Sequence, residues 1–178
     1  MALQRYKIDG YGQLELNAVA FRRSGRIEAQ CKIDDSIEFI ENGMLLAVDN
    51  VERVVKYVAD GENLPVALNY STEHMYDERT KGLKNFKLDR GSFLPRMGYQ
   101  GPGDKYTTNC LAYDDVEFPG GDTELEEAVK NVKEERLYAK ACANGAHQIT
   151  KEAEGAVCLV LAATTMPDGQ FAVKFQAL

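Results

Sequence analysis

The sequence predicts a mainly β protein, an antiparallel β-barrel or sandwich with one short helix and a long extended connector. Most of the 178 residues follow a period of two, in which apolar and polar side chains alternate. Turn-forming residues separate these runs, and one segment shows the longer period of an amphipathic helix. About nine or ten strands with a single helix favour an antiparallel architecture over a parallel sheet of βαβ units.

The first predicted hairpin joins residues 14–21 to residues 26–33. The second run is the most regular alternation in the chain, with apolar side chains at every other position from Ile27 to Ile33. A Ser-Gly pair lies between the two runs, and this pair is typical of a tight turn. We therefore expect the two runs to pair antiparallel across a turn at 23–25.

The second predicted hairpin joins residues 44–48 to residues 51–58. Asp49 and Asn50 separate these runs and favour a tight turn. Residues 65–70 follow as a further strand. The proline that begins this strand suits a first strand position or a sheet edge, because it has no N–H to donate.

The rest of the chain also predicts mainly strands, in alternating runs except at residues 156–164, which form a more continuous apolar run. The further predicted strands are residues 93–99, 105–113, 136–143, 156–164 and 170–176. A Gly-Pro-Gly turn separates the first pair. Residues 166–169, Met-Pro-Asp-Gly, join the last pair as a type I turn, because proline presets φ and glycine accepts the left-handed exit.

Residues 122–132 form the one convincing helical pattern. Leu125, Val129 and Val132 lie on one helical face, which we expect to pack on the sheet. Thr123 and Glu126 have the spacing of a capping box, and acidic residues crowd the first turn, where they complement the helix dipole. The acidic residues here are therefore assigned to the helix rather than to ligand binding.

The composition fits a single β-rich domain over residues 1–178, with a two-lobed division near residues 71–92 as the alternative. The apolar fraction of 44% is sufficient for a hydrophobic core. The net charge of −7 argues against broad binding to nucleic acid, which needs Lys and Arg gathered on one face. No apolar run approaches the length that spans a bilayer, and the N-terminus does not resemble a secretory signal, so we expect a cytosolic protein with no membrane partner.

No motif points to a catalytic residue, a cofactor or a metal site. The four cysteines are Cys31, Cys110, Cys142 and Cys158. They form no C-x-x-C pair, and we expect all four to be buried free thiols. His74 and His147 lack partners at a spacing that a metal would require. Because two strands of a β protein can each supply a carboxylate, a small hydrolase is retained as an alternative.

The most informative segment is the connector at residues 71–90. It is longer than the roughly 12–15 residues that loops in compact domains rarely exceed, and loops of this length are usually functional or disordered. Apolar side chains interrupt its charges, so we expect it to lie on another protein surface. The expected interface residues are Tyr70, Tyr76, Arg79, Leu83, Phe86 and Arg90. Interfaces favour Tyr, Phe and Arg. The alternative is that Leu83 and Phe86 fold back onto the protein's own core.

Several short segments between residues 42 and 176 resemble structural proteins from the head genes of tailed bacteriophages. These segments are GMLLAVD, NYSTE, YDERTKGLKNF, FLPRMGY, GDKYTTN and TTMPDGQFAVKFQ. Within that group, the chain looks most like the small auxiliary capsid proteins that decorate or cement the shell. The resemblance includes no catalytic motif.

The resemblance implies a non-enzymatic viral structural protein that binds the outside of a phage head. Its partners would be the major capsid protein, whose subunits it would bridge, and further copies of itself. A trimer is preferred, because decoration proteins often occupy threefold positions. The protein would be made in the host cytoplasm and located on the capsid exterior of the virion. A ligand-binding β-barrel module is the alternative from a different class, followed by the small hydrolase.

Overall fold

The computed structural model of the chain describes residues 2–58, 63–71 and 82–178. These residues are mainly β, as predicted, and form sheets of eight, six and two strands. The sixteen described strands are shorter and more numerous than the predicted runs, because several of those runs are interrupted.

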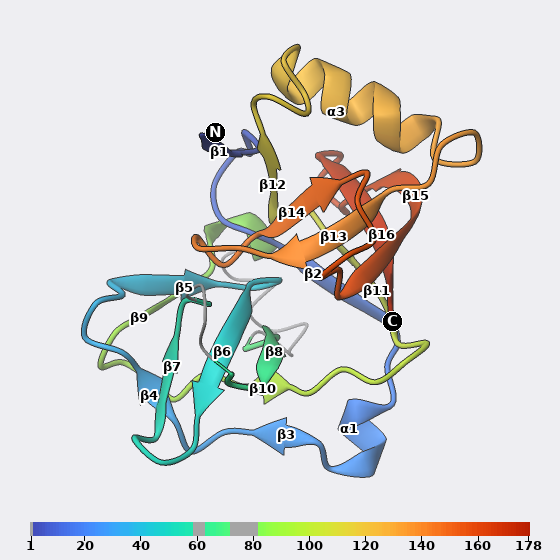
Figure 1. Cartoon of the computed structure of the whole chain (residues 1–178). Helices are drawn as coiled ribbons and strands as arrows, with labels where there is room; N and C mark the ends of the chain where they lie inside the picture. Colours follow the sequence, from blue (N-terminus) through green and yellow to red (C-terminus); the bar gives the residue numbers. More distant parts are fainter. Residues whose placement is uncertain (1, 59–62, 72–81) are drawn as a thin grey trace.

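The eight-stranded sheet is built from the two ends of the chain (Figure 1). In order of pairing, its strands are β1 (Leu3–Arg5), β12 (Leu111–Asp114), β14 (His147–Thr150), β13 (Tyr138–Ala141), β15 (Cys158–Thr165), β16 (Phe171–Ala177), β11 (Lys105–Thr108) and β2 (Leu14–Ala18). All neighbours are antiparallel except β12 and β14, which run parallel. The expectation of purely antiparallel pairing is therefore wrong at this position.

The six-stranded sheet comes from the middle of the chain. In order of pairing, its strands are β3 (Ile27–Glu28), β10 (Met97–Gly98), β8 (Val66–Asn69), β6 (Leu45–Asp49), β7 (Val54–Lys56) and β4 (Lys32–Ile33). Here β4 and β7 are parallel. Strands β5 (Phe39–Glu41) and β9 (Lys87–Asp89) form the separate pair. The chain passes between the two large sheets at residues 19–26 and 99–104, and both passages lie outside the connector at 71–92.

The predicted strand at residues 105–113 is interrupted at Asn109 and Cys110. Its halves, β11 and β12, lie near opposite ends of the eight-stranded sheet rather than continuing one strand. Because consecutive Cα atoms are only about 3.8 Å apart, the two ends of the sheet must approach each other at this point. The eight-stranded sheet is therefore strongly curled.

The predicted hairpin over residues 14–33 is wrong. Strand β2 pairs with β11 in one sheet, whereas β3 pairs with β10 in the other. Between them lies the helical turn α1 (Phe21–Ser24), which ends at Gly25 in the left-handed region. Phe21 is fully buried and packs against Tyr70 and against the backbone of Gly98, where a Cβ would collide with its ring. The path of the chain from β2 to β3 is therefore determined by burial of the Phe21 ring rather than by the Ser-Gly turn signal.

The strand pairing of two other predicted hairpins is confirmed, because β6 pairs antiparallel with β7 and β15 pairs antiparallel with β16. The predicted turn at Asp49 and Asn50 is wrong, since Asp49 belongs to β6 and pairs with Val54, and the turn spans residues 50–53. In the turn after β15 the Gly169 N–H donates to the Met166 carbonyl at 2.9 Å, and Gly169 adopts a φ of 88°. The predicted strand at 93–99 is reduced to β10, because residues 93–96 form a loop.

The predicted helix is confirmed as α3 (Gly121–Lys130), which packs against β15 with Leu125 and Val129 fully buried and Val132 buried just beyond it. The predicted capping box is wrong. No side chain caps the helix through its N-cap residue, Gly120. Instead, the Glu124 carboxylate accepts a hydrogen bond from the Gly120 N–H at 2.6 Å.

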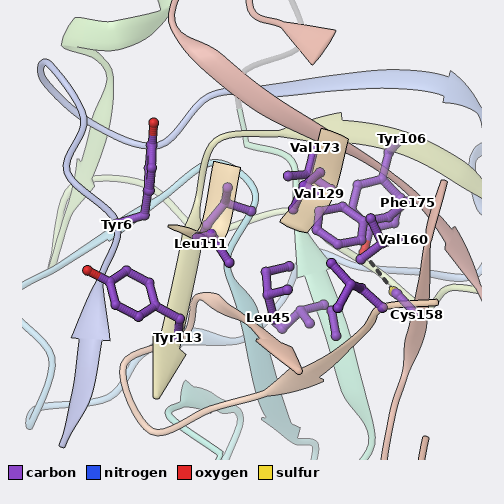
Figure 2. Close-up of a cluster of buried hydrophobic side chains, with 14 of the residues drawn as sticks. Tyr6, Leu45, Tyr106, Leu111, Tyr113, Val129, Cys158, Val160, Val173 and Phe175 are labelled. Carbon is purple, nitrogen blue, oxygen red and sulfur yellow. Dashed lines mark hydrogen bonds between the residues drawn. The ribbon is translucent and has the colours of Figure 1, made fainter. Parts of the chain in front are cut away.

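Both hydrophobic clusters of the interior contain residues of both large sheets. In the first cluster, Leu45 of the six-stranded sheet packs with Val160 and Phe175 of the eight-stranded sheet (Figure 2). In the second, Cys110 and Ala146 next to the eight-stranded sheet pack with Leu46 of the other. The two sheets therefore pack against each other through common hydrophobic clusters. Full burial of each large apolar side chain stabilises the folded state by about 1.5–3 kcal/mol.

Candidate functional site

The clearest surface feature is a loop at residues 90–96, between β9 and β10, that presents two apolar side chains to solvent. Phe93 is 80% exposed and Leu94 is 51% exposed. The described residues include three other exposed large apolar side chains, Val51, Val116 and Leu178, and none of these is next to another in the sequence. We call residues 90–96 the Phe93 loop.

Backbone and side-chain hydrogen bonds hold the first half of the Phe93 loop. The Ser92 N–H and hydroxyl both donate to the Asp89 carbonyl, at 3.1 and 2.6 Å, and close a turn. The Arg90 N–H donates to the Glu38 carbonyl at 2.9 Å, and the Arg90 guanidinium donates to the Asp35 carbonyl. These contacts fix the start of the loop to the segment that leads into β5.

The second half is tied to the end of β8. The Tyr70 N–H donates to the Arg96 carbonyl at 3.0 Å, and the Arg96 N–H donates to the Ser71 hydroxyl at 3.1 Å. Pro95 is buried, so the chain turns inward directly after Leu94. Since both ends are held, the exposed pair occupies a defined position, and little conformational entropy would be lost on binding a partner.

The composition of the Phe93 loop is that of a protein-binding surface. An exposed apolar pair flanked by Arg90 and Arg96 combines buried area on contact with hydrogen-bonding groups at the rim. Burial of an exposed Phe and Leu against a partner removes apolar surface from water, which is the main favourable contribution to association. The loop therefore has the chemistry to bind an apolar patch on another protein.

The predicted interface residues lie in different environments. Arg90 is exposed at the start of the Phe93 loop. Tyr70 is only 2% exposed and packs against Phe21 in a tilted arrangement with ring centroids 5.2 Å apart, so it offers a partner almost no surface. Leu83 and Phe86 are half-buried, in and just after the short 3-10 helix η1 (Leu83–Asn85).

Of this half-buried pair, Phe86 packs against the second hydrophobic cluster. That position agrees with the alternative in which Phe86 folds back onto the protein's own core. The remaining predicted interface residues, Tyr76 and Arg79, lie outside the described residues, as does His74.

Sequence reasoning missed Phe93 and Leu94, because the alternation at 93–99 led to their assignment to a strand. A local signal was available. Gly91 and Ser92 precede the pair and Pro95 follows it, and such residues are typical of a turn or loop. Only the structure shows that both apolar side chains point away from the core.

A second site of interest is a polar network inside the first hydrophobic cluster. The Tyr106 hydroxyl lies 2.7 Å from His147 Nε2 and 3.0 Å from Cys158 Sγ, and all three residues are fully buried. The His147 ring stacks on Phe175, with centroids 4.7 Å apart. Figure 2 shows Tyr106, Cys158 and Phe175 among the surrounding aliphatic side chains.

Burial keeps this network uncharged. It lowers the pKa of His147 to about 3 and raises the pKa of the Cys158 thiol to about 12. At neutral pH the imidazole is neutral and the thiol keeps its proton, so Cys158 lacks the thiolate that a cysteine nucleophile needs. The arrangement has the properties of a structural hydrogen-bond network, which the sequence spacing did not indicate.

A half-buried ion pair connects the N-terminal strand to β5. The Arg5 guanidinium lies 2.7 Å from the Glu41 carboxylate and 3.3 Å from Cys110 Sγ. The Gly12 N–H donates to the same Glu41 oxygen at 2.6 Å. Burial raises the pKa of the Cys110 thiol to about 12, so this cysteine is also protonated. The pair fastens the edge of the eight-stranded sheet to the two-stranded one.

All four cysteines are buried and free, as predicted. Within the described ranges, no group of three or more His, Cys, Asp or Glu side chains is arranged to hold a metal ion. No helix of the described residues is long and apolar enough to cross a membrane. These findings leave the Phe93 loop as the strongest candidate site on the described surface.

Comparisons with known proteins add no further constraint. A scan against protein-family models gave no match, and searches of curated proteins and of solved structures gave no significant match.

Proposed function

We propose that this chain is a non-enzymatic structural protein of a tailed-phage virion, which decorates or cements the outside of the capsid. Its main partner is the major capsid protein, and it attaches through the connector region and the Phe93 loop. The supporting observation is the exposed pair Phe93 and Leu94, held in a fixed loop beside Arg90. The assignment to a phage head comes from the sequence resemblance.

A modest attachment surface is sufficient for this role. One loop with two apolar side chains buries too little area for a stable isolated complex, since specific interfaces bury about 1,200–2,000 Å² in total. On a symmetric shell, each attachment raises the effective concentration of the next. Self-association, with a trimer preferred, would multiply the contacts further and bridge neighbouring capsid subunits.

The finer architecture concerns how the eight-stranded and six-stranded sheets are arranged. We propose that the curled eight-stranded sheet is an incompletely closed barrel, and that the six-stranded sheet packs on it as a second layer. The return of the chain at Asn109 and Cys110 supports the curl, and the shared hydrophobic clusters support the layering. Such a rigid β body suits a protein that must hold loops in fixed positions on a lattice.

The deciding experiment is the copy number of the chain in purified particles. Quantitative mass spectrometry against the major capsid protein should give hundreds of copies per particle, at a fixed ratio between preparations. A chain that stays in the soluble fraction when particles are sedimented would overturn the proposal and favour a ligand-binding module. Light scattering of the isolated protein tests the trimer separately.

A further inference from the structure

Strand β2 leaves an open backbone edge on the eight-stranded sheet. Four strands, β1, β2, β3 and β4, form the edges of the two large sheets in the described structure, and β2 is the longest of them at five residues. It pairs with β11 on one side only. Protected edges usually carry lysine or proline, but β2 has neither, and its one charged residue is Glu15.

An open groove of about 1090 Å³ borders the C-terminal half of this edge. Its walls are β2 from Leu16 onward, the helical turn α1 and the turn at 102–104. In Figure 1, α1 lies at the lower right, and residues 19–20 connect it to the end of β2. A strand added to the edge of β2 would therefore run toward the basic turn α1.

The accessible charge around the groove is positive. Arg23 is exposed in α1 and forms no ion pair with any described residue. Arg26 comes only within 4.0 Å of Asp104. Asp104 is 4% exposed, and its two oxygens accept hydrogen bonds from the N–H groups of Ala20 and Gly101, at 2.6 and 2.9 Å. The one carboxylate in the groove is thus already satisfied.

We propose that the β2 edge and the adjoining groove bind an extended, acidic segment of another protein chain by strand addition. The backbone of β2 would supply the main-chain hydrogen bonds, and Arg23 and Arg26 would select for acidic side chains at one end of the added strand. This site is separate in sequence from the Phe93 loop, so it does not depend on the proposed function.

A second copy of this chain is a poorer occupant. Its acidic tract at residues 114–127 is held in β12, the following turn and α3, so it offers no extended acidic strand. Direct pairing of two β2 edges would also offer the arginines of each copy a single carboxylate, Glu15. Charge complementarity therefore favours a different chain.

The test uses the full chain and two synthetic peptides of alternating threonine and valine, one ending in three glutamates and the other in three lysines. Fluorescence anisotropy should show that the acidic peptide binds and the basic peptide does not. Arg23→Glu should weaken binding of the acidic peptide by up to roughly fivefold, since a single exposed ion pair contributes at most about that factor. Arg136→Glu, an exposed arginine in the turn before β13, is the matched control and should leave affinity unchanged.

Hydrogen exchange supplies the structural readout. On addition of the acidic peptide, amides of β2 should become protected, while those of the Phe93 loop should not change. Equal binding of both peptides, or binding without protection of β2, would overturn strand addition. Concentration-dependent dimerisation that protects β2 without peptide would overturn the choice of partner. A Phe93→Ser, Leu94→Ser variant should bind the peptide normally, which separates this test from that of the proposed function.

Discussion

Two regions of this protein reverse the usual placement of polar and apolar groups. Tyr106, His147 and Cys158 place three polar atoms in contact inside the hydrophobic interior. Phe93 and Leu94 place two large apolar side chains in water. Buried polar groups and exposed apolar patches are the informative exceptions in folded proteins.

The two regions differ in whether their unusually placed side chains find partners within the protein. The Tyr106 hydroxyl pairs with His147 Nε2 and with the Cys158 thiol, whereas the buried His147 Nδ1 has no hydrogen-bond partner among the described residues. The two contacts of the hydroxyl lie within the fold, so they contribute to the stability and specificity of the core. Phe93 and Leu94, in contrast, keep 80% and 51% of their surface exposed among the described residues. Changes in the network should therefore alter folding, whereas changes in the Phe93 loop should alter association.

The largest effect is expected for Phe175→Ala. The Phe175 ring is fully buried and stacks on His147. Its loss should reduce the free energy of unfolding by about 3–5 kcal/mol, because a cavity replaces the ring. Urea unfolding followed by circular dichroism measures this change. Phe93→Ala is the matched control and should change stability by less than about 0.5 kcal/mol. Similar losses in both variants would mean that the two regions do not differ as described.

The second effect is a loss of stability in acid caused by His147. Its folded pKa of about 3 lies below the ordinary value of 6.5, so on acidification the unfolded chain takes up a proton before the folded protein does. Stability should therefore fall by about 1.4 kcal/mol per pH unit between these two values. Equilibrium unfolding from about pH 7 to about pH 4 measures the slope.

The control for this slope is His147→Gln, whose amide can still pair with Tyr106 but does not titrate. Its stability should be lower at neutral pH and nearly constant in the same window. Aspartates with lowered pKa values, such as Asp34 and Asp168, begin to lose their contribution only near about pH 5 and lose most of it below the ordinary aspartate pKa of 3.8, so the window above about pH 5 reports on His147. An unchanged acid slope in the variant would refute the assignment to His147.

A smaller effect is expected for Tyr106→Phe. This change keeps the ring but leaves His147 Nε2 and Cys158 Sγ without their shared partner, which should cost about 1–3 kcal/mol. Tyr6→Phe is the comparison, because the Tyr6 hydroxyl donates to Glu126 at 2.8 Å in a partly buried position that water can reach. That variant should lose about 1.5 kcal/mol or less, at the lower end for a hydrogen bond to a charged group, because water can hydrate the Glu126 carboxylate once the hydroxyl is removed. Thermal unfolding of the two variants side by side decides whether burial makes the difference.

The smallest effect on folding is expected for the double variant Phe93→Ser, Leu94→Ser. Both side chains are exposed, so the melting temperature should stay within about 2 °C of the parent. Sedimentation with particles should fall strongly if the loop is an attachment surface. Val51→Ser, which removes a 94% exposed side chain from the turn before β7, is the control and should sediment like the parent. Normal sedimentation of the double variant would remove the Phe93 loop from the interface.

The sequence alone determined those features whose causes lie within a few residues. The apolar stripe of Leu125 and Val129 was sufficient to place α3, and the Met-Pro-Asp-Gly turn was sufficient to pair β15 with β16. The turn-forming residues between the two apolar runs at 44–48 and 51–58 were sufficient to pair β6 with β7. The mainly β class followed from the same local periods, because side-chain period and turn chemistry are local properties.

Only the tertiary structure decided which strands share a sheet and which side chains meet. Burial of Phe21 between Tyr70 and Gly98 replaced the expected hairpin at 14–33 with a crossing between two sheets. The meeting of Tyr106 with His147, 41 positions along the chain, left no trace in local spacing. The physical reason is that strand pairing joins residues far apart in sequence, so it is selected by burial over the whole molecule rather than by any single segment.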